Sequence, residues 1–379
     1  MHPKALLDAC AELVGRVLKF EHPADAVVSR YFREHRSLGP RDFLKSALSE
    51  QEKGWLDACD AVRPDDLLER HRHNLPEWLV APLKEQLGGE FWQLVAALEQ
   101  PAPLDLRVNT LSDKREDVQR ELGLAGIGAK PTPFSPWGLR VEGKPAINKL
   151  DAFARGAVEV QDEGSQLLAL LLDAKRGEMV VDFCAGAGGK TLALGAAMRN
   201  TGRLYAFDTS AHRLDALKPR LARSKLSNVY PAAIANERDE RIKRLAGKID
   251  RVIVDAPCSG LGTLRRNPDL KWRQSPQAVQ EMTAKQASIL ASAARLLKPG
   301  GRLVYATCSL LPEENEAIAA AFTAAQPGFT PLDAAEVLAQ LKVPGAESLC
   351  RGAEGHRYLR LWPHRHATDG FFAALWTKN

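Results

Sequence analysis

Short apolar runs alternate with longer amphipathic segments from about residue 150 onward. The short runs are rich in β-branched residues, which is typical of buried parallel strands, and the longer segments repeat apolar residues at helical spacing. This alternation predicts an α/β fold with a parallel, doubly wound sheet and right-handed crossovers. Strands are expected at residues 179–184, 203–208, 229–234, 250–256 and 302–307, with two later strands at 356–362 and 371–376. Helices are expected at residues 192–200, 213–225 and 277–297, the last ending at Lys298-Pro299-Gly300-Gly301.

The pattern before residue 150 is different. Apolar residues recur at three- and four-residue spacing over residues 5–18 and 91–98, which indicates helices. After Pro101 and Pro103, a strand is expected at residues 104–109 and a helix at 114–123, and three further prolines then break the chain. These changes predict three domains, which are a helical N-terminal domain (1–100), a small α+β module (101–150) and the α/β domain (151–379).

Composition places the chain among soluble proteins. Its 379 residues suit two or three domains, and its apolar and charged fractions are those of a globular protein. The apolar runs are too short for a membrane span, and Met1-His2-Pro3-Lys4 lacks the apolar core of a signal peptide. Six scattered cysteines without a C-x-x-C pair favour neither structural disulfides nor a metal site. We therefore expect a cytoplasmic monomer without membrane contact or bound metal.

A glycine-rich segment, residues 184–191, follows the first expected strand of the α/β domain. It reads Cys184-Ala185-Gly186-Ala187-Gly188-Gly189-Lys190-Thr191. A phosphate-binding P-loop requires glycine where Cys184 stands, and a dinucleotide fingerprint requires glycine where Thr191 stands. The P-loop interpretation therefore fails, and the dinucleotide match is partial. The third interpretation is the nucleoside loop of an S-adenosylmethionine-dependent methyltransferase, which needs an acid at the end of the second strand for the ribose hydroxyls. Asp208 stands there, about 20 residues beyond the loop.

Two cysteines occupy similar settings at the ends of two expected strands. Cys258 follows residues 252–257, Cys308 follows residues 303–307, and a serine comes directly after each cysteine. Thiols at the carboxyl ends of strands in an open α/β sheet would point into the crevice where such folds bind ligands. The alternative is that both thiols are buried packing residues. We accept that interpretation for Cys10, Cys59 and Cys350, but it is weak for two cysteines in polar turns.

Two thiols beside a methyl donor favour pyrimidine chemistry. A thiolate that adds to carbon 6 of the ring makes carbon 5 nucleophilic enough to attack the donor methyl, and a second thiol could assist the later elimination. Asp255 would face the edge of the base and could polarise it by hydrogen bonding. These residues alone do not indicate which thiol attacks. The active thiol must ionise, so local positive charge or oriented N–H groups should lower its pKa.

The net charge of +5 permits a nucleic-acid partner but does not require one. Basic residues gather at residues 30–41 and 70–73, where solvated surface and RNA contact are equally good interpretations. A third group contains Arg265, Arg266 and Lys271 and lies just after Cys258. Because of that position, we predict that these three residues contact RNA.

Several motifs of the chain together resemble the RsmB/Sun (also called Nop/Sun) family of RNA cytosine-5 methyltransferases. The resemblance covers about residues 104–377 and rests on segments that include Asp255-Ala256-Pro257-Cys258-Ser259-Gly260, Ala306-Thr307-Cys308-Ser309, Leu106-Arg107-Val108-Asn109-Thr110, Pro312-Glu313-Glu314-Asn315-Glu316 and Asp369-Gly370-Phe371-Phe372. It implies a Rossmann-like class I methyltransferase sheet and an RRM-like, ferredoxin-like module at residues 101–150. The N-terminal helices are similar to a shortened NusB-like RNA-binding domain.

The resemblance also implies roles for individual residues. Cys308 corresponds to the family's nucleophile and Cys258 to the cysteine that helps to release the product. Residues 184–190 correspond to the cofactor loop, Asp208 to the ribose contact, and Asp255 to the acid near the methyl donor and target base. The family commonly has Ala-Pro where Gly186-Ala187 stand, and an acid after the third strand that contacts the adenine amine. Asn236 stands at about that place, and Asp239 follows a little later.

The expected function is therefore S-adenosylmethionine-dependent methylation of cytosine in RNA, with ribosomal RNA favoured as the partner. Three alternatives stay open at this point. The substrate could be transfer RNA, the protein could be a non-catalytic RNA-binding or ribosome-assembly factor that keeps the fold, or it could methylate DNA or a small molecule. The intact loop, Asp208, Asp255 and both thiols speak against the non-catalytic factor.

Overall fold

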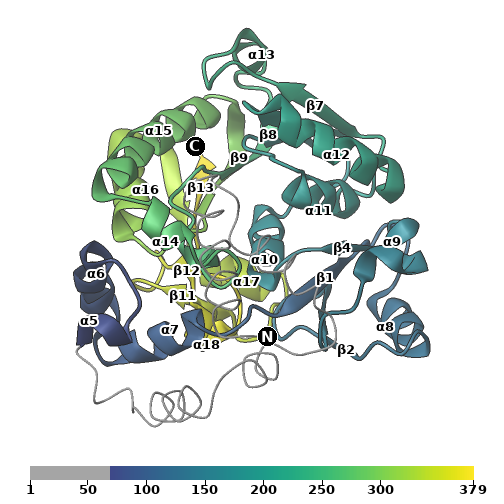
Figure 1. The fold of residues 1–379 in the computed structure, drawn as a ribbon. Coiled ribbons are helices and arrows are strands. Elements are labelled where there is room, and N and C mark those ends of the chain that lie inside the picture. The colour runs from purple at the N-terminus through teal and green to yellow at the C-terminus, as the bar shows by residue number, and fades with distance from the viewer. Residues whose placement is uncertain (1–68) are drawn as a thin grey trace, which may run out of the picture. The chain divides into compact units, whose positions relative to one another are not determined.

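The computed structural model describes residues 69–379, and the helices expected before residue 69 lie outside the described residues, as does most of the NusB-like domain. A short helix, α5 (Glu69–Arg72), precedes a compact unit that spans Leu75–Asn379. Figure 1 shows this unit coloured by residue number. Within the described residues, no helix is both long and apolar enough to cross a membrane.

Two helices open the compact unit, α6 (Glu77–Leu87) and α7 (Phe91–Leu98), and the helix expected at residues 91–98 is confirmed. The apolar faces of these helices share a core with loops that follow strands of the large sheet. The buried members of this core include Leu83, Phe91 and Leu94 from the helices and Leu261, Leu310 and Trp362 from the loops. Residues 75–98 of the predicted 1–100 domain therefore pack on the C-terminal domain.

The small α+β module forms an antiparallel sheet in the order β2-β3-β1-β4. Its elements are β1 (Leu104–Val108), α8 (Arg115–Leu124), β2 (Ala129–Pro131), β3 (Gly138–Val141), α9 (Asp151–Ala154) and β4 (Val158–Val160). Along β1 the side chains alternate, so that Leu106 and Val108 enter the core of the module. The expected strand and helix are confirmed, and the sheet continues past the predicted boundary at residue 150.

The large sheet has the strand order β7-β6-β5-β8-β9-β13-β12-β11, and β10 also pairs with β13. Its strands are β5 (Met179–Asp182), β6 (Arg203–Asp208), β7 (Val229–Ala233), β8 (Ile249–Asp255), β9 (Leu297–Thr307), β10 (Phe329–Leu332), β11 (Cys350–Arg351), β12 (Tyr358–Leu361) and β13 (Phe371–Lys378). The strands from β7 to β9 are parallel, as expected, whereas β10 to β13 pair in antiparallel fashion. The sheet is therefore mixed, and β10 and β11 were not expected.

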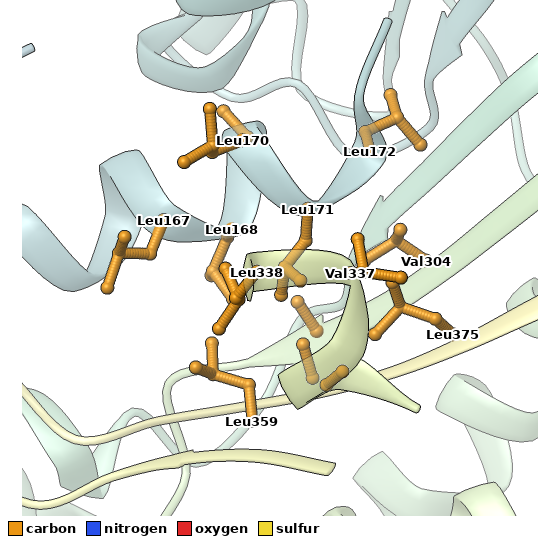
Figure 2. Close-up of a cluster of buried hydrophobic side chains, with 14 of the residues drawn as sticks. Leu167, Leu168, Leu170, Leu171, Leu172, Val304, Val337, Leu338, Leu359 and Leu375 are labelled. Atoms are coloured by element: carbon orange, nitrogen blue, oxygen red, sulfur yellow. The ribbon is translucent and has the colours of Figure 1, made fainter. Parts of the chain in front are cut away.

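Helices cover both faces of the large sheet (Figure 1). They are α10 (Glu163–Leu172), α11 (Gly189–Ala197), α12 (Ala211–Ser224), α13 (Glu240–Lys243), α14 (Leu270–Arg273), α15 (Pro276–Ala294), α16 (Glu316–Ala325), α17 (Ala334–Gln340) and α18 (Pro363–His366). Alternate residues of a strand enter opposite cores: Ile253 of β8 packs with α10 and α17, and Val252 and Val254 pack with α15 and α16. Figure 2 shows the first core, where leucines of α10 meet Leu338 of α17 and Leu375 of β13.

The end of helix α15 differs from the prediction. The helix was expected to run to residue 297 and to end at the Lys298–Gly301 turn, but it ends at Ala294, and β9 begins at Leu297. Leu297 is fully buried and pairs with Ile249 of β8 before the register shifts, so the Pro-Gly-Gly segment is an irregularity within the strand. Burial of Leu296 and Leu297 against the sheet outweighs the local helix signal.

The chain reverses its direction of travel across the sheet at β5. From β5 it continues to β6 and β7 on one side and later to β8 and β9 on the other. At such a switch point the carboxyl ends of neighbouring strands leave a crevice that binds ligands. Asp182, Asp208 and Asp255 are the last residues of β5, β6 and β8, so three carboxyl groups meet at this edge.

Burial of Asp182 predicts a pH-dependent change in stability. Its carboxylate accepts a hydrogen bond from the Thr191 hydroxyl at 2.7 Å, but burial dominates and raises the pKa of Asp182 from 3.8 to about 6. The folded protein therefore disfavours the ionised form of Asp182, which lowers the free energy of unfolding. This destabilisation is absent below pH 3.8, the ordinary pKa, and develops fully once the pH exceeds the folded-state pKa of about 6. Relative to wild type, Asp182→Asn should gain about 2 kcal/mol in free energy of unfolding between about pH 4.5 and pH 8.

Urea denaturation at the two pH values measures this gain. Any cost from the new amide group is the same at both pH values, so it cancels from the comparison. Asp215→Asn is the matched control: Asp215 is exposed on α12, and a hydrogen bond from Lys218 lowers its pKa. If the two variants respond alike to pH, burial of Asp182 does not act as described.

Candidate active site

A cavity of about 530 Å³ lies at the carboxyl edge of the parallel strands. Its lining contains six of the residues predicted from the sequence, which are Cys184, Asp208, Asn236, Asp255, Cys258 and Cys308. These residues follow or end β5, β6, β7, β8 and β9, so the parallel sheet brings them together from positions far apart in the chain. The cavity has the size of an ordinary small-molecule site.

The glycine-rich loop shapes the cavity from behind. Gly186 and Gly188 have φ angles of +56° and +83°, which side chains rarely allow, and a Cβ atom on Gly188 would lie 2.1 Å from Leu217. Of the loop residues, Cys184 lines the cavity, whereas Ala185, Gly186, Ala187, Gly188, Gly189 and Lys190 do not appear in its lining. Burial raises the pKa of the Cys184 thiol well above its ordinary value, which suits a residue that shapes the pocket.

Asp208 is held in place by backbone groups. Its Oδ2 atom accepts a hydrogen bond from the Gly186 N–H at 2.8 Å, and its Oδ1 atom accepts one from the Ser210 N–H at 2.8 Å. The side chain is almost fully buried yet lines the cavity. Each carboxylate oxygen has a second lone pair, so Asp208 keeps the capacity to accept hydrogen bonds from a ligand.

Lys190 and Asp255 form an ion pair between the loop and the end of β8. The Lys190 Nζ and Asp255 Oδ2 atoms lie 2.6 Å apart, and the side chains are 10% and 30% exposed. Burial alone would lower the pKa of Lys190, but the charge of Asp255 and its hydrogen bond outweigh burial and raise it. Lys190 therefore stays positively charged and holds the Asp255 carboxylate at the cavity wall.

The two cysteines face each other in the cavity. The Sγ atoms of Cys258 and Cys308 lie 3.4 Å apart and form a hydrogen bond. This hydrogen bond, together with burial, raises the pKa of Cys258 well above its ordinary value. Cys258 is thus held as a neutral thiol that can donate to the sulfur of Cys308.

Close backbone contacts hold the loops that carry these thiols. The Gly262 N–H donates to the Cys308 carbonyl at 2.8 Å, and the Gly370 N–H donates to the Gly262 carbonyl at 2.8 Å. A Cβ atom on Gly262 would lie 2.1 Å from the Gly370 oxygen, so glycine is required at this crossing. The Asp369-Gly370-Phe371-Phe372 motif therefore supports the cysteine loops from behind.

The loop after β7 contains the residues considered for the adenine contact. Asn236 lines the cavity, whereas the carboxylate of Asp239 caps helix α13 by accepting the Arg241 and Ala235 N–H groups. The geometry therefore favours Asn236 over Asp239. Glu237 also lines the cavity and accepts a hydrogen bond from Ser288 at 2.6 Å. The sequence interpretation missed Glu237, although an acid directly after Asn236 was a usable signal.

The basic residues after Cys258 are engaged within the protein. Arg265 and Arg266 approach Asp369 at 3.6 Å and 2.6 Å, and Arg266 also pairs with Asp162 at 2.9 Å. Lys271 is 9% exposed, and burial lowers its pKa. Their predicted contact with RNA stays a prediction. Trp272, which the sequence interpretation did not single out, is 59% exposed on the same segment.

Within the described residues, no group of His, Cys, Asp and Glu side chains has the arrangement needed to hold a metal ion. The cavity wall combines carboxylates and thiols with apolar side chains, which suits an organic ligand.

Comparison with protein families places the chain in a known group. Residues 169–377 match the family described as 16S rRNA methyltransferase RsmB/F, and residues 75–148 match the ferredoxin-like domain of RsmF/B-like methyltransferases. The second match begins at α6 and thus includes both helices that precede the small sheet.

Individual relatives agree with the family match. A protein of Synechocystis named probable ribosomal RNA small subunit methyltransferase B is 34% identical over 80% of this chain, which spans 66% of that relative's length. Ribosomal RNA small subunit methyltransferase B of Yersinia pseudotuberculosis is 35% identical to this chain. The match covers 82% of this chain and 68% of the length of that relative.

The crystal structure of PH0851 is similar to this chain, with 35% sequence identity and a TM-score of 0.75. The match covers 85% of this chain and 71% of the PH0851 chain. This similarity confirms the predicted Rossmann-like methyltransferase fold. Membership of the methyltransferase family supports the predicted cofactor, S-adenosylmethionine. The chain belongs to the RsmB/F family of 16S rRNA methyltransferases.

Proposed function

We propose that this protein methylates carbon 5 of cytosine in ribosomal RNA. The observation that carries the proposal is the pair of thiols, with Sγ atoms 3.4 Å apart, in the cavity that also contains Asp208 and Asp255. Methylation at carbon 5 needs one thiolate for addition and gains from a second thiol at elimination. The names of the relatives, which refer to the small ribosomal subunit, favour ribosomal RNA over transfer RNA.

The residues around the cavity fit S-adenosylmethionine, which supplies the methyl group when bound. Asp208 is proposed to accept hydrogen bonds from the ribose hydroxyls, because backbone groups fix its carboxylate at the cavity wall. Asn236 and Glu237 border the cavity beyond it and are proposed to receive the adenine amine. The glycine-rich turn holds Asp208 through the Gly186 N–H.

Cys308 is proposed to add to carbon 6 of the cytosine. The charge of Cys308 is among the influences that raise the pKa of Lys190, so the two groups are close enough for the ammonium to stabilise a thiolate. The raised pKa of Cys258 supports the same assignment, because it favours the protonated form of that thiol. Asp255, held by Lys190, is proposed to accept a hydrogen bond from the exocyclic amine of the base.

Product release reverses the addition. Once a base has removed the carbon 5 proton, the bond between carbon 6 and the Cys308 sulfur breaks and the sulfur leaves as a thiolate. The Cys258 thiol, 3.4 Å away, is proposed to stabilise that leaving group by donating a hydrogen bond. The target base must be extruded from its stack to reach this cavity. Trp272 is proposed as a stacking surface for a neighbouring unpaired base, because its ring is exposed close to the loop that carries Cys258.

Trapping of the covalent intermediate tests the roles of the two thiols. Cys258→Ala should accumulate an RNA–protein adduct because release is impaired, whereas Cys308→Ala should form none because addition is lost. Radiolabelled RNA that stays with the protein on a denaturing gel measures the adduct. Cys350→Ala, in a buried position away from the cavity, serves as the control and should behave as wild type. An adduct with Cys308→Ala but none with Cys258→Ala would reverse the assignment.

Comparison of substrates tests the choice of RNA. Purified protein with S-adenosylmethionine should place 5-methylcytosine in 16S ribosomal RNA, detected by bisulfite sequencing, and should leave transfer RNA and DNA unmodified. Methylation of transfer RNA alone would show that transfer RNA, and not ribosomal RNA, is the substrate. Activity on DNA alone would reject the proposal, and failure to bind S-adenosylmethionine in calorimetry would favour a non-catalytic RNA-binding factor.

A further inference from the structure

Glu314 is a fully buried carboxylate directly behind the two thiols. It is the last residue of a short 3-10 helix, η5 (Pro312–Glu314), which follows the Cys308 loop. Its exposed fraction is 0%. No ion pair of Glu314 occurs among the described residues, so a buried acidic side chain depends on neutral hydrogen-bond donors alone. Burial of a carboxylate destabilises the folded protein unless its hydrogen-bond donors are well placed, so a role in function would explain why Glu314 is buried here.

Four donors converge on the Glu314 carboxylate. Its Oε1 atom accepts the Ser259 N–H at 2.8 Å and the Gln286 side-chain amide at 3.0 Å. Its Oε2 atom accepts the hydroxyl groups of both Ser259 and Ser309. Gln286 in turn donates to the Pro257 carbonyl at 2.9 Å, and the Tyr305 hydroxyl donates to the Glu314 carbonyl at 2.6 Å.

The two serines are the residues that directly follow the two cysteines. One carboxylate therefore ties the Cys258-Ser259 loop to the Cys308-Ser309 loop, although the loops leave different strands and lie 50 residues apart in the chain. The Sγ–Sγ distance of 3.4 Å depends on the relative placement of these loops. Glu314 is the group that contacts both of them at the positions next to the sulfur-bearing residues.

Glu314 also acts on the thiols through its charge. The hydrogen bond with Cys308 and burial are the main causes of the raised pKa of Cys258, and the Glu314 carboxylate raises that pKa further. The charge of Glu314 thus favours the neutral form of Cys258 and leaves the proton on the thiol that is proposed to assist release. A neutral residue of the same shape would keep the packing but lose this effect.

We propose that Glu314 is a positioning residue that sets the separation of the two thiols by tying together the loops that carry them. This inference rests on the proposed cytosine-5 chemistry for its consequence in catalysis, but its effect on the thiols exists whatever the substrate. Ser259 and Ser309 transmit the constraint, and Gln286 orients the carboxylate.

Glu314→Gln tests the proposal because it preserves the shape of the side chain and removes its charge. The pH dependence of alkylation by iodoacetamide, followed separately for the two cysteine-containing peptides by mass spectrometry, should shift to lower pH for Cys258. The turnover number for RNA methylation should fall about 100-fold, because a neutral amide holds the two serines less firmly than a carboxylate does and small displacements of reacting groups cost this much. The KM for RNA and the affinity for S-adenosylmethionine should stay within about twofold of wild type.

Two further variants serve as controls. Glu313→Gln changes the neighbouring exposed glutamate and should leave both the alkylation profile and turnover unchanged. Glu314→Asp keeps the charge on a shorter side chain, so turnover should still fall because the shorter carboxylate no longer links the two cysteine loops in the wild-type geometry. The other titratable side chains near the thiols are the same in all three variants, and these are Cys184, Lys190, Asp255, Lys285 and Tyr305.

The outcomes separate this inference from the proposed function. If Glu314→Gln retains the wild-type alkylation profile and turnover, Glu314 is not a positioning residue. If wild-type protein methylates no RNA, the proposed function fails, and the alkylation profile still decides whether Glu314 controls the thiols. Should Glu314→Gln fail to fold, Ser259→Ala removes one hydroxyl link and keeps the backbone link, and an unchanged Cys258 profile and unchanged turnover in that variant would overturn the inference.

Discussion

Three carboxyl groups lie close together at the ends of neighbouring parallel strands. The site depends on the hydrogen bonds that stabilise these buried groups. Asp182, Asp208 and Asp255 each take a hydrogen bond from the same turn, from the Thr191 hydroxyl, the Gly186 N–H and the Lys190 ammonium respectively. Buried carboxylates without such partners would strongly destabilise the fold. The left-handed conformations of Gly186 and Gly188 let six residues supply all three donors, so the turn that forms the cofactor cavity also stabilises the strand ends.

A second set of constraints places the thiols. The loop after β8 and the loop after β9 cross where Gly262 contacts both Cys308 and Gly370, and glycine is needed because the backbones approach so closely. Glu314 joins the same loops on their buried side through Ser259 and Ser309. Contacts on both sides of the cysteines limit the freedom of the sulfur atoms. This rigidity suits a reaction in which one sulfur attacks and the other must stay within hydrogen-bond reach.

Sequence interpretation succeeded where the signal was local and failed where it was not. Asp208, Cys258 and Cys308 could be predicted because each stands at the end of a β-branched run, and parallel strand ends share one edge of a sheet. The strand β10 was missed because Pro331 argues against a strand, yet its pairing with β13 supplies the stabilising contacts. The end of α15 was placed too late, because the buried pairing of Leu297 overrides the Pro-Gly-Gly signal.

By itself, then, the sequence determined the order of the five parallel strands β5 to β9, the chemical groups at the strand ends and the choice of a nucleoside loop over a phosphate loop. These follow from periodicity and short-range spacing, which local sterics and burial control. Only the tertiary structure decided that Asn236 and not Asp239 reaches the cavity, that Lys190 pairs with Asp255 across 65 positions of sequence, and that Glu314 links both cysteine loops. Those relations depend on sheet register and on packing between distant segments, because side chains meet across the sheet edge only after the strands have paired.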